Sequence, residues 1–292
     1  MRVGVVFPQT EIGADPAVIR AYAAAVEELG FAHVIAYDHV LGADPAGHPG
    51  WSGPYDVDSS FHEPFVLFGY LAAVTSLELV SSVIILPQRQ TALVAKQAAE
   101  VDRLTEGRFR LGVGIGWNPV EYEALGKEFT DRGRRIGEQV TLLRRLWTER
   151  VVTFHGEHET VTAAGLNPLP VQRPIPIWFG AHSAPALRRA GRLADGWFPQ
   201  CRPGPELDAA CEQVQRGARS AGRDAAQLGM EGRVSLSRGV DAAASLVAAW
   251  RAAGASHVSL NTMGMGAVGI DGHIGALAAV AQAIDLPPRS VS

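Results

Sequence analysis

The chain has 292 residues, of which 47% are hydrophobic and 19% are charged, as is usual for a soluble globular protein. No apolar run reaches the roughly 18 residues that cross a bilayer, so no membrane span is expected. The net charge of -4 provides no basic stripe for nucleic acid. The two cysteines give neither a disulfide framework nor a zinc cluster, and we expect reduced thiols in a cytoplasmic protein.

Short apolar runs alternate with helical patterns from the start of the chain. Residues 3–7 predict a first strand. A helix over 16–29 follows, with Asp15 as its N-cap and Gly30 ending it. A second strand is predicted over 31–36. The chain therefore begins with a strand, a helix and a second strand, which is typical of an α/β fold.

A polar stretch rich in glycine and proline, residues 41–63, interrupts this rhythm. It is too long for a simple connection, and we interpret it as a substrate loop. The alternation then resumes with helix 64–75, strand 79–86, helix 91–104, strand 109–114 and an amphipathic helix over 133–147.

Two short β-rich runs within 151–161 predict a hairpin inserted into the scaffold. The series after it reads strand 177–180, helix 183–191, strand 194–198, helix 205–221, strand 229–237, helix 241–253, strand 256–261 and helix 271–284. Eight strands, nearly all followed by helices, predict a (β/α)8 TIM barrel, with residues 1–292 as one domain and insertions at 41–63 and 151–161. A doubly wound sheet is the alternative, but the first strand lacks its Gly-x-Gly-x-x-Gly turn.

Barrels of this type carry their sites at the carboxyl ends of the strands. Asp38 and His39 are the one acid–imidazole pair at such an end. His39 is a candidate to bond a cofactor or to relay a proton near neutral pH. Adjacent side chains of a regular strand point to opposite faces, so both reach the site only if the strand breaks there. The alternative is a structural histidine beside an aspartate that caps the next loop.

Gly180, Ala181, His182 and Ser183 lie between a predicted strand and a predicted helix. Free backbone N–H groups at this helix start are suited to a phosphate, and a plain barrel turn is the alternative. Trp117, beside Gly116, is a better candidate for a pocket wall than Trp178, which lies within a predicted strand. The nine histidines show no ligand spacing at strand ends, so we expect no metal site.

Several short motifs follow one another in a characteristic order and spacing. They are Tyr37-Asp38-His39, Glu63-Pro64-Phe65, Val101-Asp102-Arg103-Leu104, Gly114-Ile115-Gly116-Trp117, Pro174-Ile175-Pro176-Ile177-Trp178-Phe179-Gly180 and Leu193-Ala194-Asp195-Gly196-Trp197. Together they resemble the bacterial luciferase-like monooxygenase superfamily, and most closely its coenzyme F-420-dependent oxidoreductases. The resemblance covers most of the chain.

The resemblance implies a barrel that binds a flavin or deazaflavin over its strand ends. It also implies a cis peptide bond without proline at the end of the third strand, where the chain presses on the ring. The residues implied as catalytic are Asp38 and His39. Those implied as cofactor-binding are Ser82, Val83, Ile84, Gly116, Trp117, Asn118, Gly180, Ala181, His182 and Ser183.

The implied activity is hydride transfer between reduced coenzyme F-420 and a small organic substrate, without oxygen. One alternative is an FMN-dependent monooxygenase, which needs a separate reductase to supply reduced FMN. A second alternative is a member of the fold that binds flavin without turnover. The Asp38-His39 pair occurs in both enzyme branches and does not separate them. The family often forms homodimers, and the substrate is not readable from the sequence.

Overall fold

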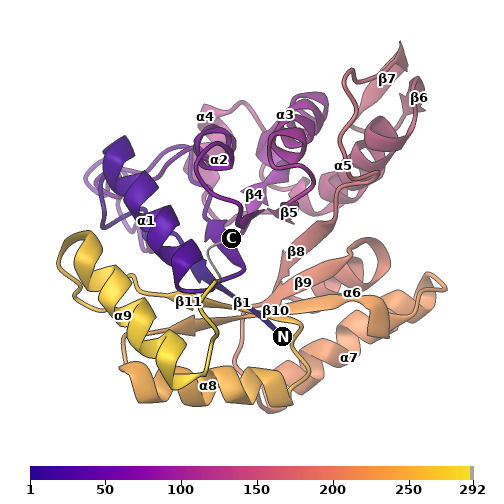
Figure 1. Cartoon of the computed structure of the whole chain (residues 1–292). Coiled ribbons are helices and arrows are strands. Elements are labelled where there is room, and N and C mark those ends of the chain that lie inside the picture. Colours follow the sequence, from indigo (N-terminus) through magenta and orange to yellow (C-terminus); the bar gives the residue numbers. More distant parts are fainter. Residues whose placement is uncertain (290–292) are drawn as a thin grey trace.

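Eight strand positions close into a parallel barrel in the computed structural model, which describes residues 1–289 (Figure 1). The strands, in chain order, are β1 (Arg2–Val6), β2 (His33–Ala36), β3 (Glu78–Ser81) with β4 (Ile84–Ile85), β5 (Phe109–Gly114), β8 (Ile177–Ala181), β9 (Gly196–Pro199), β10 (Gly229–Ser235) and β11 (His257–Asn261). Pairing of β1 with β11 and of β3 with β5 completes the ring. The predicted TIM barrel is confirmed.

Helices surround the ring of strands (Figure 1). They are α1 (Pro16–Glu28), α2 (Pro64–Ala72), α3 (Thr91–Leu104), α4 (Pro119–Ala124), α5 (Arg132–Thr148), α6 (Ala184–Leu193), α7 (Pro205–Ser220), α8 (Val240–Ala252) and α9 (Gly269–Ala283), with short 3-10 turns η1 (Leu86–Gln88) and η2 (Ala225–Gln227). The Asp15 side chain caps α1 by accepting the N–H of Ala17 at 2.8 Å, as predicted. In residues 1–289, no helix is both long and apolar enough to traverse a lipid bilayer.

The third strand is divided, so the prediction of one strand over 79–86 is wrong. β3 ends at Ser81 and β4 begins at Ile84, and the peptide bond between Ser82 and Val83 is cis. The family resemblance implied a cis bond of this kind at this place. Ser82 and Val83 leave the sheet here and line a cavity at the carboxyl end of the barrel.

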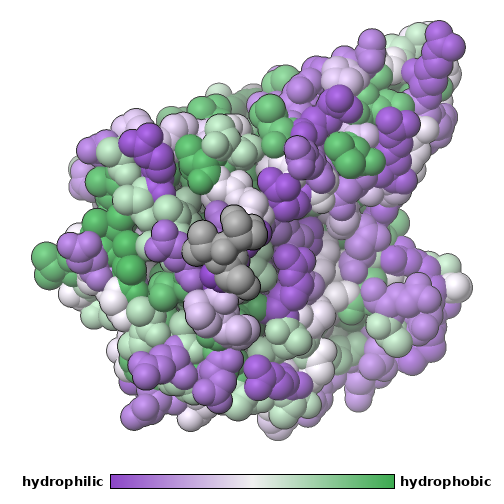
Figure 2. Space-filling view, in the orientation of Figure 1, coloured by the Kyte–Doolittle hydropathy of each residue, from purple (hydrophilic) through white to green (hydrophobic). Residues whose placement is uncertain are grey.

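Both predicted insertions are present. The chain between β2 and α2 forms neither helix nor strand. β6 (Val152–His155) and β7 (Thr160–Ala164) make a separate antiparallel hairpin that ends three residues beyond the predicted range. It projects from the barrel beside α5, and hydrophilic residues cover most of its exposed surface (Figures 1 and 2). Glu138 of α5 accepts the N–H groups of His158 and Glu159 at 3.0 Å and 2.7 Å, which fixes the hairpin turn.

The barrel interior holds an apolar layer centred on Trp178. The residues of this layer are Val6, Ile35, Tyr37, Val80, Trp178 and Phe198. Gly196 and Gly229 on the next two strands leave room for the indole, because a Cβ atom on either would lie 2.3 Å from it. A larger apolar cluster fills the space between the strands and the outer helices.

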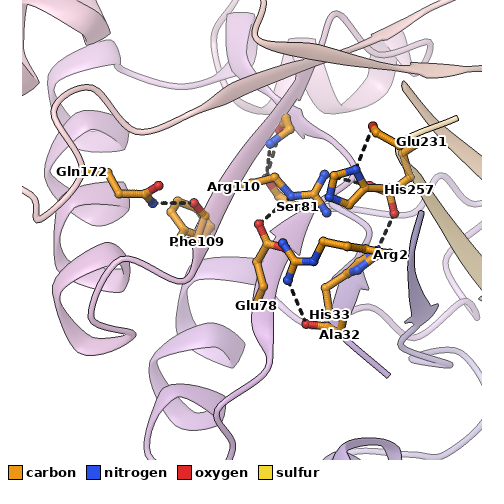
Figure 3. Close-up of polar contacts among 12 residues, drawn as sticks. Arg2, Ala32, His33, Glu78, Ser81, Phe109, Arg110, Gln172, Glu231 and His257 are labelled. Carbon is orange, nitrogen blue, oxygen red and sulfur yellow. Dashed lines mark hydrogen bonds and ion pairs between the residues drawn. The ribbon is translucent and has the colours of Figure 1, made fainter. Parts of the chain in front are cut away.

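A polar network closes the amino end of the interior (Figure 3). Arg110 donates to Glu78 at 2.7 Å and to Glu231 at 2.9 Å. His33 lies 2.6 Å from Glu231, and Gly4 leaves space for its ring. Burial alone would raise the pKa of the Glu231 carboxyl, but His33 and Arg110 hold that pKa well below its usual value. These buried charges are therefore mutually paired.

Candidate functional site

A cavity of about 500 Å³ opens at the carboxyl ends of the strands, a size suited to a small molecule or cofactor. Its wall comes from seven places in the chain: the ends of β2, β3, β5, β8 and β9, the loop between β2 and α2, and β10. Of the predicted site residues, the structure brings together ten in this wall: Asp38, His39, Ser82, Val83, Gly116, Trp117, Gly180, Ala181, His182 and Ser183.

Two predicted cofactor-binding residues lie outside the wall. The Ile84 side chain is fully buried in the large apolar cluster, because β4 pairs there with β5. Asn118 is buried at the start of α4, where its side chain accepts the N–H of Val120 at 3.0 Å. Asn118 borders a neighbouring cavity of about 260 Å³ instead. Neither residue therefore lines the cavity in which the other predicted site residues meet.

Val83 forms the floor of the 500 Å³ cavity between two glycines. A Cβ atom at Gly114 would lie 2.5 Å from the Val83 side chain, and one at Gly180 would lie 3.1 Å from it. Glycine at these positions lets the valine sit between the two strand ends, so the floor is formed by backbone and one branched side chain. Such a floor is apolar and has no projecting side chains on either side, which suits contact with a flat ring.

Asp38 is buried and its carboxylate is already engaged. Arg89 donates to Oδ1 at 2.8 Å, and the backbone N–H of Ile85 donates to Oδ2 at 3.0 Å. Arg89 also bonds Glu63, the N-cap of α2. Burial raises the pKa of the Asp38 carboxyl, although Arg89 opposes this shift. Asp38 therefore links the end of the second strand to the end of the third. This geometry gives no support to a direct catalytic role.

His39 is held by a residue that the sequence analysis missed. Its Nδ1 lies 3.3 Å from Oε1 of the buried Glu121, which also accepts the N–H of Val40 at 2.9 Å. Burial would raise the pKa of the Glu121 carboxyl, but hydrogen bonds from His39, Gln88 and the backbone lower it below its usual value. An ionised carboxylate accepts only, so Nδ1 carries the proton and Nε2 is the ring nitrogen available to a bound molecule.

Glu121 reaches His39 from α4, a six-residue helix that the sequence analysis did not predict. The signal was present in Asn118-Pro119, since asparagine favours the N-cap and proline the first helical position. Reading that pair as a helix start would have placed Glu121 in the first turn. Its pairing with His39, at a separation of 82 residues, has no local signal.

Aromatic rings surround His39. The ring centroids of Phe61, Tyr55 and Trp117 lie 4.7, 5.0 and 5.7 Å from that of the imidazole. Phe61 and Tyr55 belong to the predicted loop 41–63, which brings them to the carboxyl end of the barrel. His39, Tyr55 and Trp117 line both the 500 Å³ and the 260 Å³ cavities, so they form the wall between them.

The start of α6 is open to the 500 Å³ cavity. Ser183 occupies the N-cap position, but within the described part of the chain its side chain makes no capping bond. Its hydroxyl and the first N–H groups of α6 therefore remain available, and the helix dipole favours an anion there. In contrast, no group of three or more metal-binding side chains occurs in residues 1–289.

These features define a parallel α/β barrel with a ligand cavity over its strand ends. The luciferase-like monooxygenase model matches residues 1–283, and the chain belongs to this family. The predicted family resemblance is thereby confirmed. The general class of enzyme in this family is oxidoreductase.

Three relatives illustrate the range of the family. An uncharacterised protein of Mycobacterium tuberculosis is 43% identical over 164 residues, covering 56% of each chain. An F-420-dependent glucose-6-phosphate dehydrogenase of Segniliparus rotundus is 31% identical, covering 72% of this chain and 62% of the relative. An FMNH2-dependent dimethylsulfone monooxygenase of Pseudomonas putida is 33% identical, covering 49% of this chain and 40% of the relative. The matches thus span 40 to 62% of the length of these relatives.

The fold is shared with a solved structure of a coenzyme F-420-dependent tetrahydromethanopterin reductase from Methanopyrus kandleri. The two chains superpose with a TM-score of 0.76 at 15% identity, covering 97% of this chain and 98% of the reductase. Identity at this level speaks for the fold alone.

Proposed function

We propose that this protein binds reduced coenzyme F-420 over Val83 and transfers a hydride between it and a small organic substrate. The observation that carries the proposal is the glycine-flanked Val83 floor with His39 fixed at its edge by Glu121. The F-420-dependent relative from Segniliparus rotundus supports this cofactor class.

The chain itself would supply position, shielding and a proton-transfer group. Val83, Gly114 and Gly180 would set the plane of the cofactor ring. Ser183 and the first N–H groups of α6 would hold its phosphate. When bound, the reduced deazaflavin supplies the hydride. His39, with Nε2 directed to the site by the Nδ1 bond to Glu121, would exchange a proton with the substrate oxygen or nitrogen next to the reacting carbon.

Reduced FMN is the second candidate cofactor, because an FMNH2-dependent monooxygenase is also among the relatives. The same floor and helix start suit its ring and phosphate, and a separate reductase would then supply the reduced cofactor. A protein that binds flavin without turnover would keep the floor but would need no fixed imidazole. We also propose a cytoplasmic homodimer, as the family resemblance implies.

The deciding experiment is a titration of the full chain with coenzyme F-420 and with FMN, each oxidised and reduced, followed by absorbance and fluorescence. We expect micromolar binding of F-420 that is tighter than that of FMN. Ser183→Glu should weaken the preferred cofactor at least tenfold, because it places like charge at the phosphate. Ser220→Glu, at an exposed serine ending α7, is the matched control.

Two outcomes would count against the proposal. If neither cofactor binds at micromolar concentration, the proposed function fails. If Ser183→Glu leaves cofactor affinity unchanged, the phosphate lies elsewhere than at α6.

A further inference from the structure

Arg233 projects from β10 into the 500 Å³ cavity, where its side chain is exposed. Among the described residues that line this cavity, it is the one with a permanent positive charge. Within residues 1–289 its hydrogen bond is long, with Nη1 donating to the Tyr37 hydroxyl oxygen at 3.5 Å. Arg110, also on a barrel strand, is by contrast bound to two carboxylates. Arg233 therefore has binding capacity that the fold does not use.

Two tyrosines share the cavity with this arginine. Tyr37 and Tyr55 both line the cavity, and burial raises the pKa of each phenol, so both keep a proton to donate. Tyr55 is close enough to Tyr37 and Arg233 for their charges to affect its pKa. Trp51 Nε1–H donates to the backbone carbonyl of Tyr55 at 3.2 Å, so this contact does not occupy the Tyr55 hydroxyl.

No carboxylate of the described chain neutralises this cluster of donors. Asp38, the carboxylate that lines the same cavity, is bound to Arg89 and Ile85. Glu231 lies two residues before Arg233 on the same strand, but it is paired with Arg110 and His33. A guanidinium with two hydroxyls beside it and no carboxylate partner is a site for an oxyanion.

The barrel order separates this cluster from the expected cofactor positions. β10 is the seventh strand position and β3 with β4 is the third, so Arg233 and Val83 lie on opposite walls of the ring. The start of α6 follows the fifth position, β8, two positions away from β10. His39 contacts Tyr55 with ring centroids 5.0 Å apart, and it therefore lies beside the cluster.

We propose that Arg233, Tyr37 and Tyr55 bind an oxyanion group, carboxylate or phosphate, of the substrate. This inference rests on the proposed function for the position of the cofactor over Val83. The substrate is then a small organic acid or phosphate ester. Its charged end is anchored on β10 and its reacting carbon lies between the Val83 floor and His39.

The test uses the full chain saturated with its cofactor and isothermal titration with benzoate, benzamide and inorganic phosphate. Benzamide is the neutral counterpart of benzoate. We expect at least one of the two anions to bind at least tenfold more tightly than benzamide, and which one binds identifies the substrate anion as carboxylate or phosphate. Arg233→Gln should remove the preference, and Arg233→Lys should restore part of it. Arg238→Gln, at an exposed arginine just after β10, is the matched control.

Cofactor affinity is measured on every variant. We expect it to change less than twofold in Arg233→Gln. A tenfold loss would assign Arg233 to the cofactor and overturn the inference, as would equal binding of anions and benzamide by the wild type. If the wild type binds no cofactor, the proposed function fails, and the same titration on cofactor-free protein decides the Arg233 site separately.

Discussion

The two ends of the barrel interior use the same kinds of side chain in opposite ways. At the amino end, Arg110, Glu78, Glu231 and His33 are buried and paired with one another (Figure 3). At the carboxyl end, the Arg233 guanidinium is exposed to an open cavity with one long hydrogen bond. The difference lies in whether the fold itself supplies the partner of each charged side chain. We therefore call the amino end, with its paired charges, the closed end and the carboxyl end, with its cavity, the open end.

The comparison also shows what a shifted pKa means in this molecule. The buried Glu231 has a pKa held well below its usual value, and desolvation lowers the pKa of His257 to about 3. Both residues belong to the amino-end network, and neither lines the 500 Å³ cavity. The pKa shifts of Glu231 and His257 therefore belong to the structural network, whereas unused binding capacity marks the site.

The largest expected effect comes from breaking the closed end. Arg110→Met keeps much of the side-chain volume but leaves Glu78 and Glu231 buried without their cation. Removing one partner of a buried ion pair costs about 3–5 kcal/mol. We expect the free energy of unfolding in urea to fall by that amount, while cofactor affinity of the folded fraction stays the same.

Arg2→Met is the control for Arg110→Met. Arg2 also pairs with Glu78, but half of its side chain is exposed, so its loss should cost less than about 1 kcal/mol. Equal effects of the two substitutions would show that the closed end does not depend on burial of its charges.

The fold was largely predictable because each strand and helix carries a local signal. Apolar runs of strand length, helical periodicity and caps such as Asp15 depend on neighbours in sequence. The division of the third strand was missed because Ser81 and Ser82 do not break the predicted strand pattern over 79–86, and nothing local shows that Ser82 and Val83 leave the sheet. α4 was missed because six residues contain too few turns for a periodic pattern.

The site was predictable only as far as strand ends can be read. That rule pointed to His39 and the Gly180 turn, whereas Val83 was implied by the family resemblance. It could not find contacts between distant segments, such as Glu121 with His39, or Arg89 with Asp38 at a separation of 51 residues. Arg233 was missed because it lies within a strand, and alternation alone does not tell which face of an isolated strand points into the barrel.

The open end gives the next largest effects. His39→Gln should lower turnover about 100-fold with little change in cofactor affinity, because it removes the proton-transfer group.

Glu121→Gln should lower turnover about tenfold, because the neutral amide holds Nδ1–H less strongly and no longer fixes the tautomer. Steady-state kinetics separate the two, since only Glu121→Gln keeps an imidazole at position 39.

An equal loss of cofactor affinity and turnover in His39→Gln would instead make His39 a binding residue. A Glu121→Gln variant with wild-type kinetics and an unchanged pH profile would leave Glu121 with a purely structural role at the start of α4.

The smallest expected effect is a pH dependence of stability that arises from His257 at the closed end. His257 takes up a proton in the unfolded chain below its usual pKa of 6.5, but in the folded protein only near 3. Unfolding therefore binds a proton in this window, and stability falls as the pH is lowered from 6.5 towards 3. The limiting slope is about 1.4 kcal/mol per pH unit, and we expect about 1 kcal/mol in total between pH 6.5 and 5, because the imidazole is partly exposed.

His257→Gln should remove that part of the slope, measured by urea unfolding at several pH values, with His48→Gln in the exposed loop as the control. The burial of His273 lowers its pKa as well, so the difference between wild type and variant is the quantity to read. Glu231 does not interfere, because its lowered pKa removes stability only below pH 4.5. An unchanged slope in His257→Gln would mean that the amino end admits a proton in the folded state, and the contrast between a closed and an open end would then hold for geometry but not for charge.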